Sequence, residues 1–212
     1  GEAEYAGEPA AVDRAYIPPE EFTRLHFKGT TLDELVEFGI KNKEYFDKNI
    51  FKSDLDFYKP PSLTEFKKAG IKGKHYFGYY KKWTPQENFF YAAENTGFQP
   101  NPERTEGTYS KYASIDDKLD GMHYYMKYIK FGFARATDDA SHEVRDGHIT
   151  REEAISLIKI YDGEFPKKYF NDFLNYLNIT SAEFWDVVDS WRPPHLWIKE
   201  SNQWKLKKTI FE

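Results

Sequence analysis

The chain of 212 residues contains no cysteine and only two methionines. The missing thiols exclude disulfide bonds, thiolate zinc sites and a cysteine nucleophile together. A chain that needs no disulfide is compatible with a reducing compartment, so we expect a cytoplasmic protein.

Long apolar runs and an excess of positive charge are also missing. No stretch approaches the roughly 20 apolar residues that cross a bilayer, so we expect no membrane span. Residues 1–14, GEAEYAGEPAAVDR, lack the basic-then-apolar order of a signal peptide. The net charge is -5 and the pI is about 5.8, which argues against nucleic acid as a main partner.

Aromatic side chains are abundant, at 18% of the residues, whereas the mean hydropathy is -0.79. The length allows one generous domain or two small ones. Their core must rely on Phe and Tyr more than on aliphatic runs. The clusters YFGYYKKW (76–83) and NFFY (88–91) could stack on sugar rings, but we interpret them as core.

Helix starts of the type Ser/Thr-x-x-Glu/Asp recur along the chain, each before an amphipathic run. Six pairs fit this pattern: Thr31 with Glu34, Ser62 with Glu65, Thr84 with Glu87, Ser114 with Asp117, Thr150 with Glu153, and Thr180 with Glu183. Apolar stripes of helical period follow, the longest from Ile115 to Phe133, with others in 165–177 and 184–191.

These patterns predict a mainly α fold with a small β component. From Thr150 onward we expect three helices and then a hairpin that turns between Glu200 and Gln203. Upstream, we expect one helix over 31–46 and a short strand within 74–83.

The stretch RDGHITREE (145–153) looks like half of a calcium-binding EF-hand loop. With Gly147 at the sixth position of that loop, Val144 stands where an oxygen ligand is required. We therefore predict a joint between two helices, with Gly147 as a left-handed cap and Thr150 opening the second helix. The histidines show no metal spacing, so no metal site is predicted.

Longer stretches resemble one enzyme family. They are GEAEY (1–5), GKHYFGYYKKWTPQENFFYAAENTGF (73–98), RTEGTYSKYASIDDKLDG (104–121), HYYMKYIKFGFARATDDASHEVRDGHITREEAISLIKIYDGEFP (123–166) and FWDVVDSWRPPHLW (184–197). In this order they resemble the C-terminal half of N-acetyl sugar amidotransferases, which belong to the PP-loop ATP pyrophosphatase superfamily. These enzymes act in bacterial surface glycan biosynthesis, including lipopolysaccharide and pseudaminic or legionaminic acid.

The resemblance implies the C-terminal region of an α/β PP-loop (adenine nucleotide alpha hydrolase-like) enzyme. Residues 1–60 would be the tail of the nucleotide-binding domain with an irregular insertion. Residues 61–111 would form an aromatic-rich mixed segment, and residues 112–212 a helical region ending in the hairpin. The SGG-x-D-S phosphate loop is not in these residues. We expect it upstream of Gly1, in a truncated or split enzyme, and expect this chain to be inactive by itself.

The reaction implied by the resemblance converts a sugar acetamido group into an acetamidino group. ATP with Mg²⁺ would activate the amide oxygen, and ammonia would come from a partner glutaminase, because this chain has no cysteine nucleophile. The sugar substrate would be N-acetylated and linked to a nucleotide or glycan precursor.

The resemblance also assigns roles to single residues. We expect Glu2, Glu4 and Asp138 to be catalytic, with Glu2 and Tyr5 also near the nucleotide. The expected substrate-binding residues are Arg104, Thr105, Glu106, Thr108, Tyr109, Lys111, Asp116, Asp117 and Arg135. The same residues also have interpretations that involve no function: a solvated acidic tail, an ordinary polar loop, carboxylates at a helix start, and a solvated helix face. Two other functions stay open, a non-catalytic module that binds sugar nucleotides and a surface that docks the glutaminase.

Overall fold

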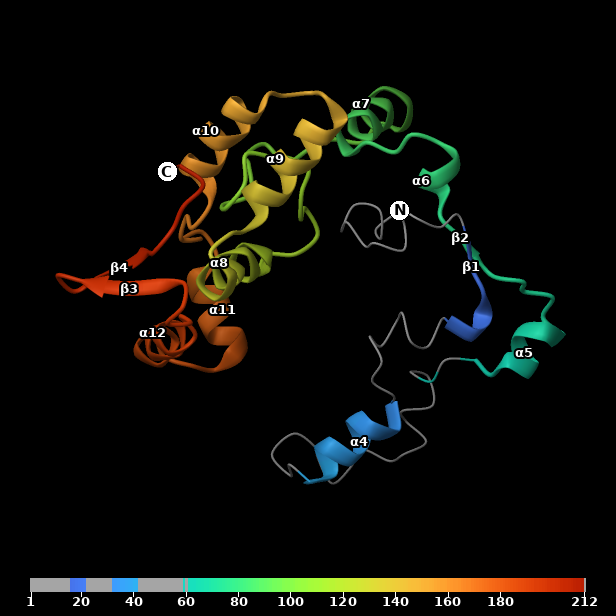
Figure 1. Ribbon diagram of the computed structural model, residues 1–212, viewed down its shortest axis with the longest axis horizontal. Helices are drawn as coiled ribbons and strands as arrows, with labels where there is room; N and C mark the ends of the chain where they lie inside the picture. The colour runs from blue at the N-terminus through green and yellow to red at the C-terminus, as the bar shows by residue number, and fades with distance from the viewer. Residues whose placement is uncertain (1–15, 22–31, 42–58, 60, 212) are drawn as a thin grey trace. The chain divides into compact units, whose positions relative to one another are not determined.

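A computed structural model describes residues 16–21, 32–41, 59 and 61–211 (Figure 1). The chain forms two compact units, Gly1–Trp83 and Thr84–Glu212. The predicted fold class is confirmed in outline, because helices dominate and the strands form two small antiparallel pairs.

The described residues of the first unit include a short ribbon and helices α4, α5 and α6. Strand β1 (Tyr16–Ile17) pairs antiparallel with β2 (Lys74–His75), with Tyr16 opposite His75. The helices are α4 (Leu32–Lys41), α5 (Leu63–Lys68) and α6 (Phe77–Tyr80). The predicted strand over 74–83 is therefore confined to its first two residues. The predicted helix over 31–46 is observed from Leu32 to Lys41, and its other residues lie outside the described ones.

In the second unit, the elements from Thr150 onward follow the predicted order of three helices and a hairpin. Its elements are α7 (Pro85–Thr96), α8 (Asp120–Phe131), α9 (Arg135–Asp146), α10 (Arg151–Tyr161), α11 (Phe170–Leu177), α12 (Ser181–Ser190), β3 (Trp197–Glu200) and β4 (Gln203–Leu206). In the hairpin, Glu200 pairs with Gln203, and Ser201 and Asn202 form the turn with φ values of 47° and 65°.

Four of the six predicted helix starts are confirmed. Capping boxes are complete at Ser62, Thr150 and Thr180, and the Thr84 hydroxyl accepts a hydrogen bond from the Glu87 N–H. The cap at Thr31 lies outside the described residues.

The helix start predicted at Ser114 is wrong, because α8 begins only at Asp120. The Ser114 hydroxyl is hydrogen-bonded to the Tyr124 phenol instead of capping a backbone N–H. Asp117 Oδ1 accepts the Leu119 N–H at 2.7 Å, and this local turn precedes the helix.

The long apolar stripe from Ile115 to Phe133 is also interrupted. Helix α8 ends at Gly132, which has a φ of 77°, and α9 starts three residues later. Ile115 and Phe133 are 42% and 41% exposed, so the two ends of the stripe leave the core.

The main core of the second unit joins α8, α12 and the hairpin. Its buried members are Met122, Tyr125, Ile129, Phe184, Val188 and Trp197. The Trp197 indole N–H donates to the Ile129 carbonyl at 2.7 Å, which satisfies the polar end of this ring inside the core. Aromatic residues therefore contribute much of this core, as the composition predicts. The clusters at 76–83 and 88–91 are not core as interpreted, because most of their rings are 41–68% exposed, namely Phe77, Tyr79, Tyr80, Trp83, Phe90 and Tyr91.

Helices α9 and α10 lie side by side and are joined at Gly147, whose φ of 80° is the predicted left-handed cap (Figure 1). Ala140, Ala154 and Ile158 pack between the two helices. The small alanines let the backbones approach closely, so this pair forms a second, smaller core.

The residue before α9, Ala134, has no polar side chain that could cap the helix, and the carboxylate of Asp162 at the end of α10 takes that role. This carboxylate accepts the Ala134 N–H at 2.9 Å, the Thr137 N–H at 3.2 Å and the Thr137 hydroxyl at 2.5 Å. Burial raises the pKa of Asp162, and these three hydrogen bonds oppose that rise.

Among the described residues, no helix combines the length and the apolar character required to span a bilayer.

The α9–α10 core can be tested with two isoleucines of α10. Ile158 is 8% exposed, whereas Ile160 is 64% exposed. We expect Ile158→Ala to lower the free energy of unfolding by about 2–5 kcal/mol, because it leaves a cavity against Ala140 and Ala154. The matched variant Ile160→Ala should stay within about 0.5 kcal/mol of the wild type. Urea unfolding measures both, and equal losses would contradict this packing.

Candidate functional site

A cavity of about 300 Å³ opens in the second unit between three segments of the chain. Residues 101–106 and 114–118 line it together with the start of α8, and residues 166, 168 and 169 ahead of α11 complete the wall. Residues about 60 positions apart in the sequence therefore meet in one place.

The cavity gathers five of the predicted substrate-binding residues, namely Arg104, Thr105, Glu106, Asp116 and Asp117. The other four, Thr108, Tyr109, Lys111 and Arg135, do not line it. Of the predicted catalytic and nucleotide-binding residues, Asp138 lies on α9, and Glu2, Glu4 and Tyr5 lie outside the described residues. The roles assigned to these residues stay predictions.

Arg104 is held firmly in the wall of the cavity. Its guanidinium makes two hydrogen bonds of 2.7 Å to the Glu164 carboxylate and lies 4.7 Å from the centre of the Tyr161 ring. The paired carboxylate raises the pKa of Arg104, and the guanidinium lowers the pKa of Glu164. Glu164 also accepts the Gly107 N–H at 2.8 Å, so one carboxylate fixes both ends of residues 104–107.

Backbone contacts hold the neighbouring residues of the same loop. The Glu106 carboxylate accepts the N–H groups of Lys167 and Lys168 at 2.9 and 3.1 Å. The Thr105 hydroxyl donates to the Ala113 carbonyl at 2.8 Å. Loop 104–107 is therefore preorganised before any ligand binds, because its polar groups are already oriented.

The rim of the cavity has two cations on one aromatic ring. The ammonium groups of Lys118 and Lys168 each lie 5.4 Å from the centre of the Tyr169 ring. Lys168 pairs with Glu103 at 3.0 Å, and Lys118 lies 3.9 Å from Asp172. Both lysine side chains are more than half exposed, so a ligand can compete for them at little cost.

Sequence reasoning missed Ser114, Lys168 and Tyr169 as cavity residues. Ser114 was interpreted as a helix cap and Tyr169 as part of a core stripe. Only the tertiary contact between the loop at 104–107 and the connection at 164–168 brings them together, and no local pattern encodes that contact.

A buried network lies behind the cavity. The Thr108 hydroxyl, which is fully buried, donates to Asp139 Oδ2 at 2.6 Å. Arg135 Nε donates to Asp139 Oδ1 at 2.8 Å, and Arg135 also donates to the Tyr124 phenol oxygen at 3.3 Å. This arrangement neutralises a carboxylate that is only 8% exposed.

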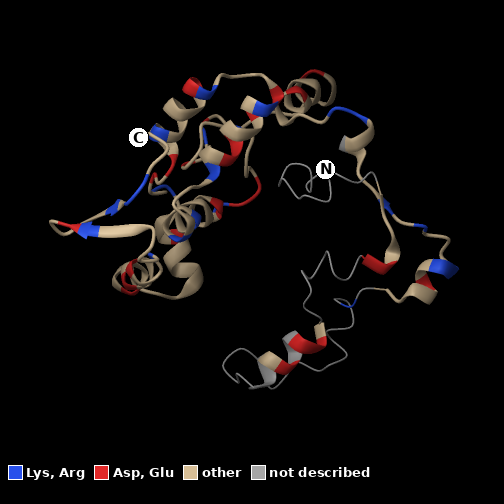
Figure 2. Cartoon of the chain, in the orientation of Figure 1, with Lys and Arg blue, Asp and Glu red and all other residues tan. Residues whose placement is uncertain are grey.

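Helix α9 carries acidic and basic residues along its length (Figure 2), among them Arg135, Asp138, His142 and Arg145. Asp138 is paired with Lys127 of α8, and Arg145 lies 2.8 Å from His142 Nδ1. Contacts of this kind are expected on a helix face that carries ion pairs, whether or not it binds a ligand.

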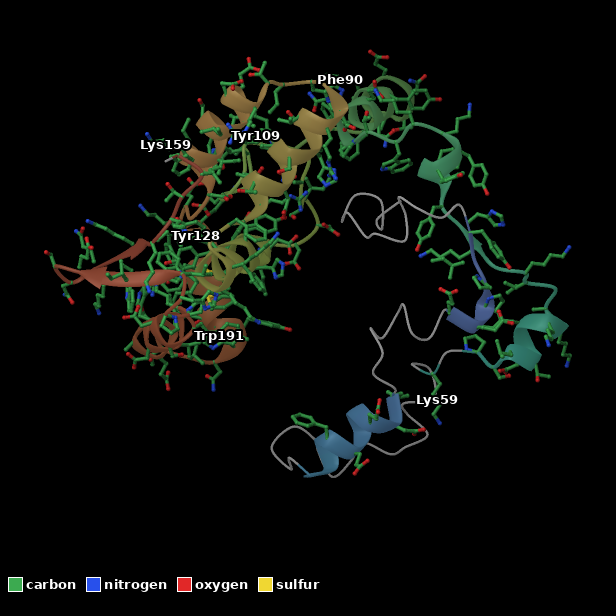
Figure 3. The ribbon with its side chains drawn as sticks, viewed as in Figure 1. Lys59, Phe90, Tyr109, Tyr128, Lys159 and Trp191 are labelled. Carbon is green, nitrogen blue, oxygen red and sulfur yellow. The ribbon has the colours of Figure 1, made fainter. Side chains whose placement is uncertain are left out.

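Tyr109, labelled in Figure 3, packs against the small core between α9 and α10. Burial raises the pKa of Tyr109 and, on α9, that of Glu143, and Glu143 adds to the effect on the tyrosine. Nearby, Tyr112 donates to Gln86 of α7 at 2.7 Å and stacks on Phe89, and burial raises its pKa to about 12. Both phenols therefore keep their hydrogens at neutral pH.

The cavity combines groups that recognise a polar, ring-shaped ligand. Four carboxylates can accept hydrogen bonds from hydroxyl groups, three cations can donate, and Tyr169 offers an aromatic face. Within the described residues, no group of His, Asp or Glu side chains could hold a metal ion.

The pKa of Glu164 gives a test of the loop's anchor. Because Arg104 lowers this pKa in the folded chain, the ion pair stabilises the fold above the unfolded value of about 4.3 and is lost as the pH falls further. We expect Glu164→Gln to reduce the free energy of unfolding by about 1–2 kcal/mol near neutral pH.

The same variant should flatten the pH dependence of that free energy between about pH 5 and pH 3. Glu94→Gln, which removes an exposed carboxylate of α7, is the matched control and should leave the pH profile nearly unchanged. Urea unfolding at a series of pH values measures both. A wild-type slope in Glu164→Gln would show that the pair contributes nothing.

Comparison with known proteins adds a family to this geometry. No curated protein matches the chain. Residues 106–210, just under half of the chain, match the family described as LPS biosynthesis protein WbpG-like, C-terminal domain. Most of the cavity wall falls within this range. The match therefore connects this part of the chain to lipopolysaccharide biosynthesis and broadly supports the predicted family.

Proposed function

We propose that the cavity between 101–106, 114–118 and 166–169 binds the N-acetylated sugar of an amidotransferase that acts in lipopolysaccharide biosynthesis. The observation that carries this proposal is the convergence of five predicted substrate residues on one cavity, most of it within the family match. The resemblance in the sequence supplies the reaction class.

The chemistry of the walls supports a sugar as the ligand. Asp116 is an exposed carboxylate in the cavity wall, and it can accept hydrogen bonds from sugar hydroxyls. Tyr169 can stack on the apolar face of a pyranose ring, and Lys118 and Lys168 can hold the phosphate groups of a nucleotide-linked or lipid-linked sugar.

The proposed reaction replaces the amide oxygen of the acetamido group with nitrogen. ATP would supply the adenylyl group that esterifies this oxygen, with release of pyrophosphate, and so make the oxygen a leaving group. Ammonia from a glutaminase then forms the new C–N bond, and the oxygen departs with AMP. The described residues hold no cluster for a magnesium ion, so we assign them the sugar and not the nucleotide. The cytoplasm, where ATP and nucleotide sugars occur together, is the proposed location.

The cavity can be tested by titrating the chain with UDP-N-acetylglucosamine and following the amide signals by NMR. We expect the signals of the three cavity segments to shift, whereas ATP with Mg²⁺ should leave them unchanged. Asp116→Ala and Tyr169→Ala should each weaken binding by about five- to tenfold, because each removes one polar or stacking contact. Asp186→Ala, an exposed carboxylate of α12, is the matched control.

Two results decide between the alternatives. If the sugar nucleotide shifts no cavity signal at millimolar concentration, the cavity is not its site. If it binds, a second experiment separates an amidotransferase from a pure binding module. ATP, Mg²⁺, ammonium and a protein with the SGG-x-D-S segment are added to the chain and the sugar. Only the amidotransferase then yields an acetamidino sugar, which mass spectrometry detects.

A further inference from the structure

Ser114 has a backbone conformation that its position in the chain does not explain. Its φ of 52° lies in the left-handed region, which is unfavourable for a non-glycine residue. The other non-glycine residues of this kind in the described part of the chain end a helix (Asn178) or turn the hairpin (Ser201 and Asn202). Ser114 does neither and lines the cavity. Such outliers often mark binding sites.

The buried phenol of Tyr124 holds the hydroxyl of Ser114 in place. This hydroxyl is hydrogen-bonded to the phenol of Tyr124, which is 4% exposed and lies on α8. Arg135 of α9 donates to the same phenol oxygen and lies 5.4 Å from the centre of the Tyr124 ring. Arg135 is itself fixed by Asp139 at 2.8 Å. The chain of contacts therefore leads from a buried carboxylate to one hydroxyl at the cavity.

The direction of these hydrogen bonds follows from the donors. A guanidinium can only donate, so Arg135 occupies an acceptor site on the Tyr124 oxygen. The phenol keeps its hydrogen, since burial raises the pKa of Tyr124. With its oxygen accepting from Arg135, the phenol can donate its hydrogen to Ser114 Oγ, and the Ser114 hydrogen is then available to an acceptor in the cavity. The network turns Ser114 into an oriented donor.

The surroundings of Ser114 define the acceptor that it suits. Asp116 and Asp117 follow it in the same wall and disfavour an anion there. The lysines that suit phosphate lie with Tyr169 at the rim. A neutral carbonyl oxygen fits a neutral hydroxyl donor beside two carboxylates.

We propose that the Ser114 hydroxyl recognises the carbonyl oxygen of the sugar's acetamido group, and that Tyr124 and Arg135 position it for that purpose. This inference rests on the proposed function and adds the residue that distinguishes an acetamido sugar from one with a plain hydroxyl.

The test compares UDP-N-acetylglucosamine with UDP-glucose, which keeps the diphosphate and lacks the acetamido group. Ser114→Gly removes the hydroxyl, and glycine adopts a positive φ without strain, so the fold should stay intact. We expect the Kd of the acetamido sugar to rise about fivefold and that of UDP-glucose to stay the same. Ser201→Gly, with a φ of 47° in the hairpin turn, is the matched control and should change neither.

Tyr124→Phe tests the positioning role, because it keeps the ring beside Arg135 and loses only the hydroxyl. It should lower the preference for the acetamido sugar in the same direction as Ser114→Gly, whereas a purely structural role would weaken both sugars equally. Tyr176→Phe, at a residue 76% exposed on α11, is its control.

The outcomes separate the role of Ser114 from the proposed function on which it rests. A selective loss for the acetamido sugar supports the role of Ser114. An equal loss for both sugars, or no loss, overturns that role while the sugar site stands. If the wild-type chain binds neither sugar, the proposed function and this inference both fail.

Discussion

The buried carboxylate of Asp139 is the group on which the second unit depends most. It receives hydrogen bonds from Thr108 of the loop and from Arg135 of its own helix. Removing one partner of a buried charge typically costs about 3–5 kcal/mol, so neither partner is dispensable. Through Arg135 the same carboxylate controls Tyr124 and, beyond it, Ser114 in the cavity wall. The site is thus coupled to a carboxylate that is largely shielded from solvent.

Acidic side chains form many of the contacts that hold the backbone of the second unit in place. Glu106, Asp162 and Glu164 each accept backbone N–H groups from another segment, and Glu153 and Glu183 complete capping boxes within theirs. A carboxylate that accepts backbone N–H groups stabilises a turn or a helix start without any regular ladder of hydrogen bonds. An acidic, mainly helical chain with few strands can therefore hold its loops in fixed conformations.

The sequence predicted local features well because their causes are local. The boxes at Thr150 and Thr180, the cap at Gly147 and the turn after Glu200 each depend on residues within a few positions. The cavity was predicted only in part, since Arg104 meets Glu164 across 60 positions and no periodicity reports that contact. Ser114 is not a helix cap because its hydroxyl is bonded to Tyr124, and the local capping pattern does not report that contact.

Helices α9 and α10 are connected to each other at both ends of the helix pair that they form. Gly147 turns the chain at one end, and at the other the carboxylate of Asp162 binds the first N–H groups of α9. Neither helix can fray at its free end without breaking a contact to the other. Amide hydrogens of the two helices should therefore exchange with solvent as one cooperative unit, opening together rather than turn by turn.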